Sequence, residues 1–259
     1  MKIAAVIPAR YNSTRFPGKP LAEIAGEPMI RWVYERAKKS LFVNEVWVAT
    51  DDERIHKIVK FFGGNSRMTS FEHQSGTDRI AEIARHMDWD LVVNVQGDEP
   101  LVEPTMIDEL ILCFKNNPSV YMGTLKREIH NKKDVLNPNV VKVVTDEEGF
   151  ALYFSRSPVP FVRNLWGTIN EIEKVPFPSP IFKHVGLYGY KRDFLLNFAS
   201  LQPTTLEKIE HLEQLRALEH GYKIKVGITK KDSLGVDHPN DLKKVRTVVK
   251  KKGLSCALP

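Results

Sequence analysis

Residues 3–20 read IAAVIPARYNSTRFPGKP, an apolar run followed directly by a loop of cations and hydroxyls. Residues 3–7 are apolar at every position, as expected for a central parallel strand that helices cover on both faces. Open α/β sheets bind their ligands at the carboxyl ends of such strands. This stretch therefore predicts an α/β fold with a ligand site in the loop that begins at Pro8.

The loop has the composition of a phosphate site. Arg10, Arg15 and Lys19 are spaced five and four residues apart, so a curled loop can aim all three cations at one polyphosphate. Ser13 and Thr14 add hydroxyl donors. Neither a G-x-G-x-x-G motif nor the Walker A spacing occurs, so the loop differs from a P-loop. A solvated basic surface loop is the alternative that chemistry alone leaves open.

The composition favours a globular protein with an anionic ligand. The chain has 259 residues, 42% hydrophobic and 27% charged, enough for one domain with or without a subsidiary lobe. Its net charge of +6 suits an anionic ligand but is too small and too dispersed to favour nucleic acid. The lysines at 250–252 lie near the end of a predicted C-terminal helix, where they complement its dipole.

The cysteines and the apolar runs indicate where the protein works. Cys113 and Cys256 have neither metal-ligand spacing nor a disulfide framework, so we expect reduced thiols. The N-terminal apolar run is too short for a signal peptide, and no run approaches the roughly 18 residues of a membrane span. We therefore expect a soluble cytoplasmic protein with no membrane partner.

Strand and helix patterns alternate through the first half of the chain. Helices are predicted at 28–39, 52–62, 76–87 and 105–115, and strands at 45–49, 91–95, 121–126 and 140–145. Such a βαβ succession predicts a mostly parallel sheet with helices on both faces.

The second half changes character at residues 157–181, where five prolines predict an irregular excursion, either a flap or a contact between subunits. Strands are predicted at 185–190 and 223–228, and a C-terminal helix from near Pro239. Another helix begins at Thr204, which forms a capping box with Glu207. Its spacing places three polar residues, Glu210, Glu213 and Gln214, together on one flank, which is either a site or an ordinary solvated face.

Acidic turns follow two of the predicted strands. Asp98 lies in QGDEP, directly after the apolar strand at 91–95, so it can meet the phosphate loop across the edge of the sheet. Carboxylate and polyphosphate repel each other, and Mg²⁺ between them removes the conflict. Asp237, after the strand at 223–228, is the candidate second ligand, although it can equally be a helix cap or a turn residue.

Segments spread over nearly the whole chain match one family in order. They are IPAR to KP (7–20), ATD (49–51), HQSGTDR (73–79), NVQGDEP (94–100), ALYFSR (151–156), HVGLYGY (184–190), LEQLR (212–216) and GVD (235–237). On these segments the chain resembles the CMP-Kdo synthetases, the 3-deoxy-manno-octulosonate cytidylyltransferases. It departs from the family pattern at Asp78, where glutamate is common, and in its longer proline-rich excursion.

The resemblance implies a reaction and an architecture. The reaction is CTP + Kdo → CMP-Kdo + diphosphate, with Mg²⁺, which activates the sugar Kdo (3-deoxy-manno-octulosonate) for lipopolysaccharide assembly. The implied fold is the Rossmann-like nucleotidyltransferase sheet, as a single domain over 1–259. Within it, residues 127–220 are expected to contribute a subsidiary lobe for sugar binding and dimerisation, and the protein is expected to be a homodimer.

The resemblance also implies roles for individual residues. Nucleotide-binding residues would be Pro8, Ala9, Arg10, Ser13, Arg15, Lys19, Gln74, Ser75, Gly76, Arg79, Gln96 and Asp98. Kdo-binding residues would be Arg156, His184, Tyr188, Glu213 and Gln214, with Arg156 as the candidate for the sugar carboxylate. Lys19, Arg10, Asp98 and Asp237 would carry the catalysis, the two aspartates as metal ligands.

Other functions remain open at this point. The acceptor can be a related acid sugar such as 8-amino-Kdo or a sialic acid, because few residues decide that choice. A non-catalytic nucleotide-sugar binding protein on the same fold is a second alternative. A metal-dependent glycosyltransferase is a third, although the basic loop suits a free triphosphate better than a nucleotide sugar.

Overall fold

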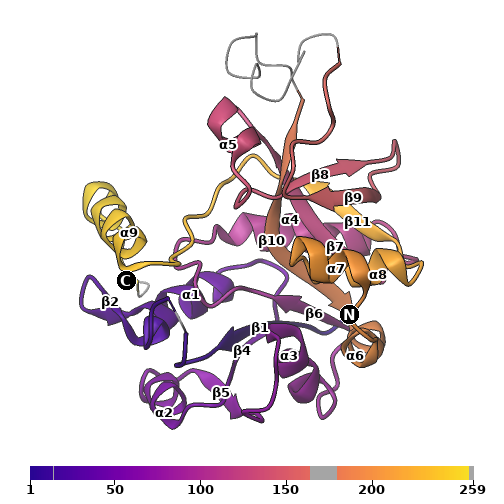
Figure 1. The fold of residues 1–259 in the computed structure, drawn as a ribbon. Helices are drawn as coiled ribbons and strands as arrows, with labels where there is room; N and C mark the ends of the chain where they lie inside the picture. Colours follow the sequence, from indigo (N-terminus) through magenta and orange to yellow (C-terminus); the bar gives the residue numbers. More distant parts are fainter. Residues whose placement is uncertain (14, 164–179, 257–259) are drawn as a thin grey trace.

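The computed structural model describes residues 1–13, 15–163 and 180–256 (Figure 1). Over these residues, nine strands form the main sheet. They are β1 (Ile3–Ala9), β4 (Glu45–Thr50), β5 (Asn65–Met68), β6 (Leu91–Asn94), β7 (Met122–Glu128), β8 (Lys142–Thr145), β9 (Ala151–Ser155), β10 (Phe182–Lys191) and β11 (Ile224–Ile228). Two short strands, β2 (Glu23–Ile24) and β3 (Glu27–Pro28), pair separately.

The sheet is mostly parallel, as the sequence predicts. Its main path runs β11-β7-β10-β6-β1-β4-β5, and β8 joins it through β10 and pairs with β9. β1 is parallel to β4 and β6, and β7 is parallel to β11. β10 is antiparallel to β6, β7 and β8, a direction that the sequence pattern did not indicate. The first residues of β10 therefore lie at the edge where the parallel strands end.

Helices cover both faces of the sheet, as expected. They are α1 (Met29–Lys38), α2 (Glu53–Phe61), α3 (Gly76–Ala84), α4 (Pro104–Lys115), α5 (Lys132–Leu136), α6 (Arg192–Ser200), α7 (Thr205–Glu210), α8 (Gln214–Glu219) and α9 (Pro239–Lys252). Ile3, Ala5 and Ile7 of β1 pack into one core with α1, α2 and α4. Ala4 and Val6 face the other core, which contains α3 and α6. This alternation explains why β1 is apolar at every position.

Local sequence explains where several helices begin. Asp52 caps α2 by accepting a hydrogen bond from the backbone of Arg54 at 2.9 Å. Ser75 and Asp78 form a reciprocal capping box at the start of α3. Helix α3 ends at Ala84, about one turn before the predicted end at residue 87. The sequence analysis missed the helices α5 and α6 and the strands β2, β3, β5 and β9.

The helix predicted from Thr204 is broken, and this corrects the sequence analysis. His211 has a left-handed backbone with φ of 51°, and it separates α7 from α8. The guanidinium of Arg156 accounts for the break, because it binds the carbonyls of Glu210 at 2.6 Å and His211 at 3.3 Å. The predicted single polar flank is therefore wrong: Glu210 contacts β9, whereas Gln214 is buried.

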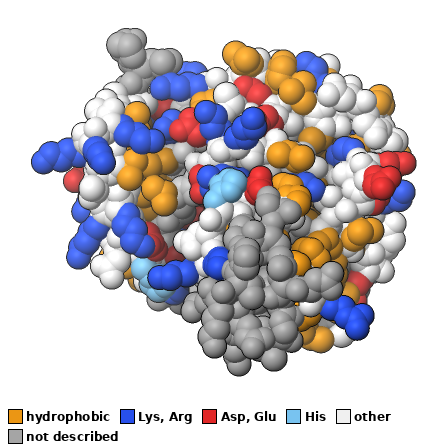
Figure 2. Space-filling view, turned by 90° about the horizontal axis from the view of Figure 1, so that it is seen from above, with side chains coloured by type: hydrophobic (Ala, Val, Ile, Leu, Met, Phe, Trp, Pro, Cys, Tyr) orange, Lys and Arg blue, Asp and Glu red, His pale blue; other side chains and the backbone are white. Residues whose placement is uncertain are grey.

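The predicted excursion at 157–181 lies largely outside the described residues. Across the described chain, none of the helices combines the length and apolarity needed to span a bilayer. Lysine, arginine and acidic side chains are interspersed on the described part of the face seen in Figure 2. This mixing agrees with the modest net charge of +6.

Candidate active site

The loops after β1 and β6 touch at the carboxyl edge of the sheet. A Cβ on Gly97 would lie 2.6 Å from the carbonyl oxygen of Pro8, so only glycine allows this approach. A Cβ atom on Gly76, the first residue of α3, would lie 3.2 Å from Cγ of Pro8. Pro8 is thus the point where three of the predicted nucleotide-binding segments meet.

The loop after β1 curls around Tyr11. The carbonyl of Tyr11 accepts hydrogen bonds from the backbone N–H groups of Ser13 at 3.1 Å and Gly18 at 2.8 Å. The Tyr11 ring packs against the core, and the Arg54 guanidinium lies 3.3 Å from the ring centroid. Gly18 has φ of 70°, which lets the chain turn into the short helix η1 (Lys19–Leu21). The curled loop expected from the sequence is confirmed.

Lys19 brings the two predicted acidic turns together. Its ammonium lies 2.8 Å from Oδ2 of Asp98 and 3.7 Å from Oδ1 of Asp237. Arg15 reaches the same Asp237 oxygen at 3.2 Å. The backbone N–H of Val236 donates to the carbonyl of Asp98 at 2.8 Å, which holds the two turns side by side. Two of the three predicted cations, Lys19 and Arg15, therefore form one cluster with the two predicted carboxylates.

The oxygens of this cluster fit a magnesium ion. Mg²⁺ takes one or two carboxylates from a protein and completes its shell with phosphate oxygens and water. Asp98 and Asp237 offer that donor set from two neighbouring turns, beside cations suited to the phosphates. Over the described residues, no third histidine, cysteine or carboxylate joins them in a metal-binding group.

Arg79 is placed differently from the prediction. Its side chain is fully buried, and it binds Asp51 at 2.7 Å and the hydroxyl of Thr69 at 2.5 Å. A guanidinium bound in this way holds the ends of β4 and β5 in place, while its Nε has no hydrogen-bond partner in the described structure. Arg10 lies close enough to Arg79 that this charge, after burial itself, lowers the pKa of Arg10.

The start of α3 holds the other predicted nucleotide residues. The Ser75 hydroxyl accepts from the backbone of Asp78 at 3.0 Å, and Gln74 donates to the carbonyl of Glu72 at 3.0 Å. A cavity of about 700 Å³ is lined here by Gln74, Ser75 and, from the turn before α8, Glu213. Gln96 lies near β6, where its amide is 3.3 Å from Oδ1 of Asn94.

Two predicted sugar residues project from β10. Nε2 of His184 is 2.9 Å from the hydroxyl of Thr124, and its ring centroid is 5.3 Å from that of Tyr188. Burial lowers the pKa of His184 to about 3, so the imidazole is neutral. Burial, together with the charge of Glu213, raises the pKa of Tyr188, so its phenol stays protonated.

Two further predicted sugar residues, Glu213 and Gln214, lie at the start of α8. Oε2 of Glu213 accepts from the Thr77 hydroxyl at 2.5 Å, and Oε1 is 3.8 Å from Arg216. Burial raises the pKa of Glu213. Gln214 is 3% exposed, and its Nε2 has no hydrogen-bond partner in the described structure. The solvated-face alternative is therefore wrong for Gln214.

The Arg156 side chain binds backbone carbonyls, a set of contacts that the sequence did not suggest. Each of its guanidinium nitrogens donates to a backbone carbonyl, of Glu210, Pro138 and His211. The Glu210 carboxylate returns two contacts, accepting from the Arg156 backbone at 2.9 Å and the Ser155 hydroxyl at 2.7 Å. The described structure thus joins Arg156 to the break between α7 and α8 rather than to the other predicted sugar residues.

Comparisons with known proteins agree with this geometry. A model of the cytidylyltransferase family matches residues 4–224. The 3-deoxy-manno-octulosonate cytidylyltransferase of Geobacter sulfurreducens is 58% identical over 248 residues, which cover 95% of this chain and 98% of the relative. The enzyme of the same name from Geotalea uraniireducens is 58% identical over 254 residues, 97% of this chain and 100% of the relative. This chain belongs to the 3-deoxy-manno-octulosonate cytidylyltransferase family.

Solved structures extend the comparison to the fold. A CMP:2-keto-3-deoxy-manno-octonic acid synthetase in complex with CTP superimposes with a TM-score of 0.89 at 42% identity, covering 97% of this chain and 100% of that one. A 4-diphosphocytidyl-2C-methyl-D-erythritol synthase from Anaerococcus prevotii has a TM-score of 0.61 at 12% identity, over 96% of this chain and 98% of that one. The second likeness shows the nucleotidyltransferase fold alone.

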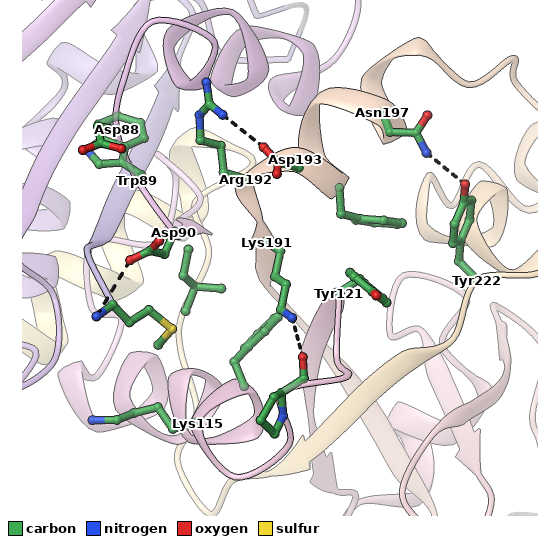
Figure 3. Close-up of a pocket in the computed structure, with 15 residues that line it drawn as sticks. Asp88, Trp89, Asp90, Lys115, Tyr121, Lys191, Arg192, Asp193, Asn197 and Tyr222 are labelled. Atoms are coloured by element: carbon green, nitrogen blue, oxygen red, sulfur yellow. Dashed lines mark hydrogen bonds and ion pairs between the residues drawn. The ribbon is translucent and has the colours of Figure 1, made fainter.

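Three of the predicted site residues have buried polar atoms without a partner. Arg10 Nη2, Glu213 Oε1 and Gln214 Nε2 are buried without a hydrogen bond, a costly state that a polar ligand relieves. A second cavity, of about 1010 Å³, lies at the opposite edge of the sheet, and none of these three residues lines it. Its lining residues are drawn in Figure 3. There Arg192 pairs with Asp193 at 3.0 Å, and Asn197 with the Tyr222 hydroxyl at 2.9 Å.

Sequence reasoning missed three residues that shape the site. Thr77, which lies in the QSGTDR segment, binds Glu213, and Asp51, in the ATD segment, neutralises Arg79. Both segments were noticed, so the motif itself was the available indication. Thr124 contacts His184 only because β7 pairs with β10, and nothing in the local sequence indicated that pairing.

Proposed function

We propose that this protein transfers CMP from CTP to the anomeric hydroxyl of Kdo and releases diphosphate. The observation that carries the proposal is the Lys19 ammonium held between Asp98 and Asp237, beside a curled basic loop. Cations in this arrangement suit a triphosphate, and carboxylates suit the metal ion that accompanies it. The acceptor follows from the relatives, which are named as 3-deoxy-manno-octulosonate cytidylyltransferases.

On the nucleotide side, the loop after β1 holds the phosphates. Arg10, Arg15 and Lys19 supply charge, and Ser13 adds neutral donors together with the backbone of Pro8 and Ala9. In the free protein, Lys19 and Arg15 are neutralised by the two aspartates. When the triphosphate binds, the same cations can turn to the diphosphate oxygens, where negative charge develops as the α-phosphorus is attacked in line.

Selection of the base falls to the start of α3. Gly76 lies next to Pro8, and Gln74 and Ser75 precede it directly; fixed donors and acceptors at that place can distinguish cytosine from other bases. Gln96 lies at the adjoining edge, after β6. Arg79 acts here by holding Asp51 and Thr69, which keeps the ends of β4 and β5 beside the pocket.

Asp98 and Asp237 would hold the metal ion. Bound Mg²⁺ supplies positive charge to the phosphate oxygens and to the attacking hydroxyl. The two carboxylates are presented from separate turns, and the hydrogen bond from Val236 to the Asp98 carbonyl fixes their spacing. Metal binding and phosphate binding are therefore coupled through the same residues.

The sugar side is formed by β10 and by the residues at the start of α8. His184 is neutral and Tyr188 protonated, so both meet sugar hydroxyls as uncharged hydrogen-bonding groups. Glu213 Oε1 and Gln214 Nε2 offer an acceptor and a donor that have no hydrogen-bond partner in the described structure. Arg156 is proposed as the guanidinium that meets the sugar carboxylate, through N–H groups that its carbonyl contacts leave free.

The organisation of the protein follows the family. The proposal is one nucleotidyltransferase domain over 1–259, with residues 127–220 contributing the sugar-binding and dimerisation lobe, acting as a cytoplasmic homodimer. Sedimentation should then give twice the 29.6 kDa of one chain. A monomer at enzyme concentrations used for assay would remove the dimer from the proposal and leave the reaction intact.

The reaction is tested by diphosphate release with Mg²⁺ from CTP, UTP, ATP and GTP, with Kdo present or absent and 8-amino-Kdo as a parallel acceptor. Release that requires CTP and Kdo together supports the proposal. Release with CTP and 8-amino-Kdo alone keeps the mechanism and changes the acceptor. No release from any pair, despite measurable CTP binding, would identify a nucleotide-binding protein without this activity.

A further inference from the structure

The segment that carries Asp237 has no regular secondary structure of its own. It is the β11–α9 linker, residues 229–238, which crosses the carboxyl edge of the sheet. The linker begins where the backbone of Thr229 donates to the carbonyl of Lys126 at 2.9 Å. It ends beside the site, where Val236 is buried and donates to the Asp98 carbonyl at 2.8 Å. The position of Asp237 therefore depends on how this linker is attached.

Asp232 attaches the linker midway between those two points. Its carboxylate forms ion pairs with Lys183 at 2.8 Å and with Arg127. The backbone N–H of Ser233 also donates to this carboxylate at 3.1 Å. The two cations come from different strands, Arg127 from β7 and Lys183 from β10, so one carboxylate fixes the linker to two strands of the sheet.

The sheet has a reason of its own to bind this carboxylate. Arg127 and Lys183 are directly opposite each other in the antiparallel pairing of β7 and β10. Like charges at opposed positions destabilise a strand pair, and a carboxylate between them removes the repulsion. Asp232 is 46% exposed, so each single ion pair is weak, and the shared arrangement matters more than either contact.

We infer that Asp232 is a positioning residue, which holds the β11–α9 linker so that Asp237 faces Asp98 and Lys19. The inference rests on the proposed function, in which Asp237 binds the magnesium ion. Asp232 itself is not a metal ligand in this scheme, because its carboxylate is engaged by Arg127 and Lys183. A looser linker should weaken the binding of Mg²⁺ and CTP, although every side chain proposed to bind them is still present.

Asp232→Asn is the direct test, with Asp232→Glu as the conservative variant. Loss of two exposed ion pairs predicts about a fivefold increase in the Mg²⁺ concentration needed for half-maximal turnover, with kcat at saturating Mg²⁺ within about twofold of wild type. Calorimetric titration with Mg²⁺ and CTP, without Kdo, should show a similar loss of affinity. Asp232→Glu should restore most of it. Asp193→Asn is the matched control, because Asp193 pairs with Arg192 at the opposite edge.

Trypsin provides a readout that needs no activity. Lys230 and Lys231 are exposed cleavage sites within the linker. Arg127→Met combined with Lys183→Met removes both partners of Asp232 without altering the linker sequence, and it should accelerate cleavage there about fivefold. An unchanged cleavage rate would overturn the attachment. Faster cleavage with an unchanged affinity for Mg²⁺ and CTP would overturn the positioning role.

Failure of the proposed function gives a different pattern. Wild-type protein would then release no diphosphate with any acceptor, whereas the cleavage rates and the Mg²⁺–CTP titration would still measure the role of Asp232. Reduced affinity in Asp232→Asn would support the positioning role in that case as well, and unchanged affinity would overturn it.

Discussion

Lys19 lies between two carboxylates, and this contact makes Asp98 the residue whose loss should matter most. Asp98→Asn keeps the shape of the side chain and removes its charge, so the Lys19 ammonium loses a counter-charge 2.8 Å away, and the proposed metal ion would lose an anionic ligand. We expect kcat for diphosphate release to fall about a hundredfold or more. Asp193→Asn, far from the site, should be unaffected. Turnover near the wild-type value at saturating Mg²⁺ would contradict the assignment of Asp98.

His184 gives a prediction about stability rather than turnover. Burial lowers its folded pKa to about 3, so between about pH 3 and 6.5 the unfolded chain binds a proton that the folded protein does not. Stability should therefore fall as the pH falls below 6.5. From pH 7 to pH 5.5 this residue alone should cost about 1 kcal/mol of unfolding free energy. Urea denaturation of the wild type and of His184→Asn at both pH values measures this difference. The loss of unfolding free energy from pH 7 to pH 5.5 should be smaller in His184→Asn by about 1 kcal/mol. An equal loss in the two proteins would contradict a buried neutral imidazole.

Some residue positions were predictable from the sequence and others were not. The proximity of Lys19, Asp98 and Asp237 was predictable because each follows a strand, and strand ends meet at one edge of a sheet. The burial of Arg79 was not, since its partners Asp51 and Thr69 come from other elements. A motif thus identified the neighbourhood of Arg79 without indicating the direction of its side chain.

At the scale of elements, the break between α7 and α8 connects Arg156 with the proposed sugar site. Arg156→Ala removes three donors from backbone carbonyls, two of them at the break. Glu213 and Gln214 follow directly, so we expect KM for Kdo to rise about tenfold or more while KM for CTP changes little. Steady-state kinetics with each substrate varied in turn measures both. A loss of CTP binding with unchanged Kdo affinity would show that the two subsites are reversed.

The break itself could not be predicted from periodicity. The apolar residues after Thr204 continue at helical spacing across His211, although only α8 contributes buried residues; α7 packs through the partly buried Leu206 and leaves Ile209 exposed. The left-handed backbone at His211 depends on its contact with Arg156, the residue directly after β9. The capping box at Thr204 and Glu207, in contrast, is local, and the structure confirms it.

At the scale of the whole molecule, ligand binding should raise thermal stability, because buried polar atoms such as Arg10 Nη2 gain partners. With Mg²⁺ and CTP at about a hundred times the dissociation constant, the gain should be about 2.7 kcal/mol, or a Tm shift of about 5–10 °C. ATP at the same concentration should shift Tm much less. Equal shifts with both nucleotides would contradict base selection at the start of α3.

The fold as a whole was predictable in class and not in detail. Apolar strands alternating with amphipathic helices were enough for a mostly parallel sheet covered on both faces. The direction of β10 was not, because a strand buried on both faces has the same composition in either direction. Its antiparallel course brings His184 and Tyr188 next to β7 and β6, respectively.

The antiparallel strand β10 separates two sets of elements, one for each proposed substrate. Parallel strands β1, β5 and β6 precede the segments proposed to bind the nucleotide, whereas β10 and the turn before α8 carry the groups proposed to bind the sugar. The two sets share the pairing of β6 with β10. Over evolutionary time, acceptor preference can therefore drift through changes in β10 and α8 while the donor stays the same, and a new sugar specificity need not begin by rebuilding the recognition of CTP.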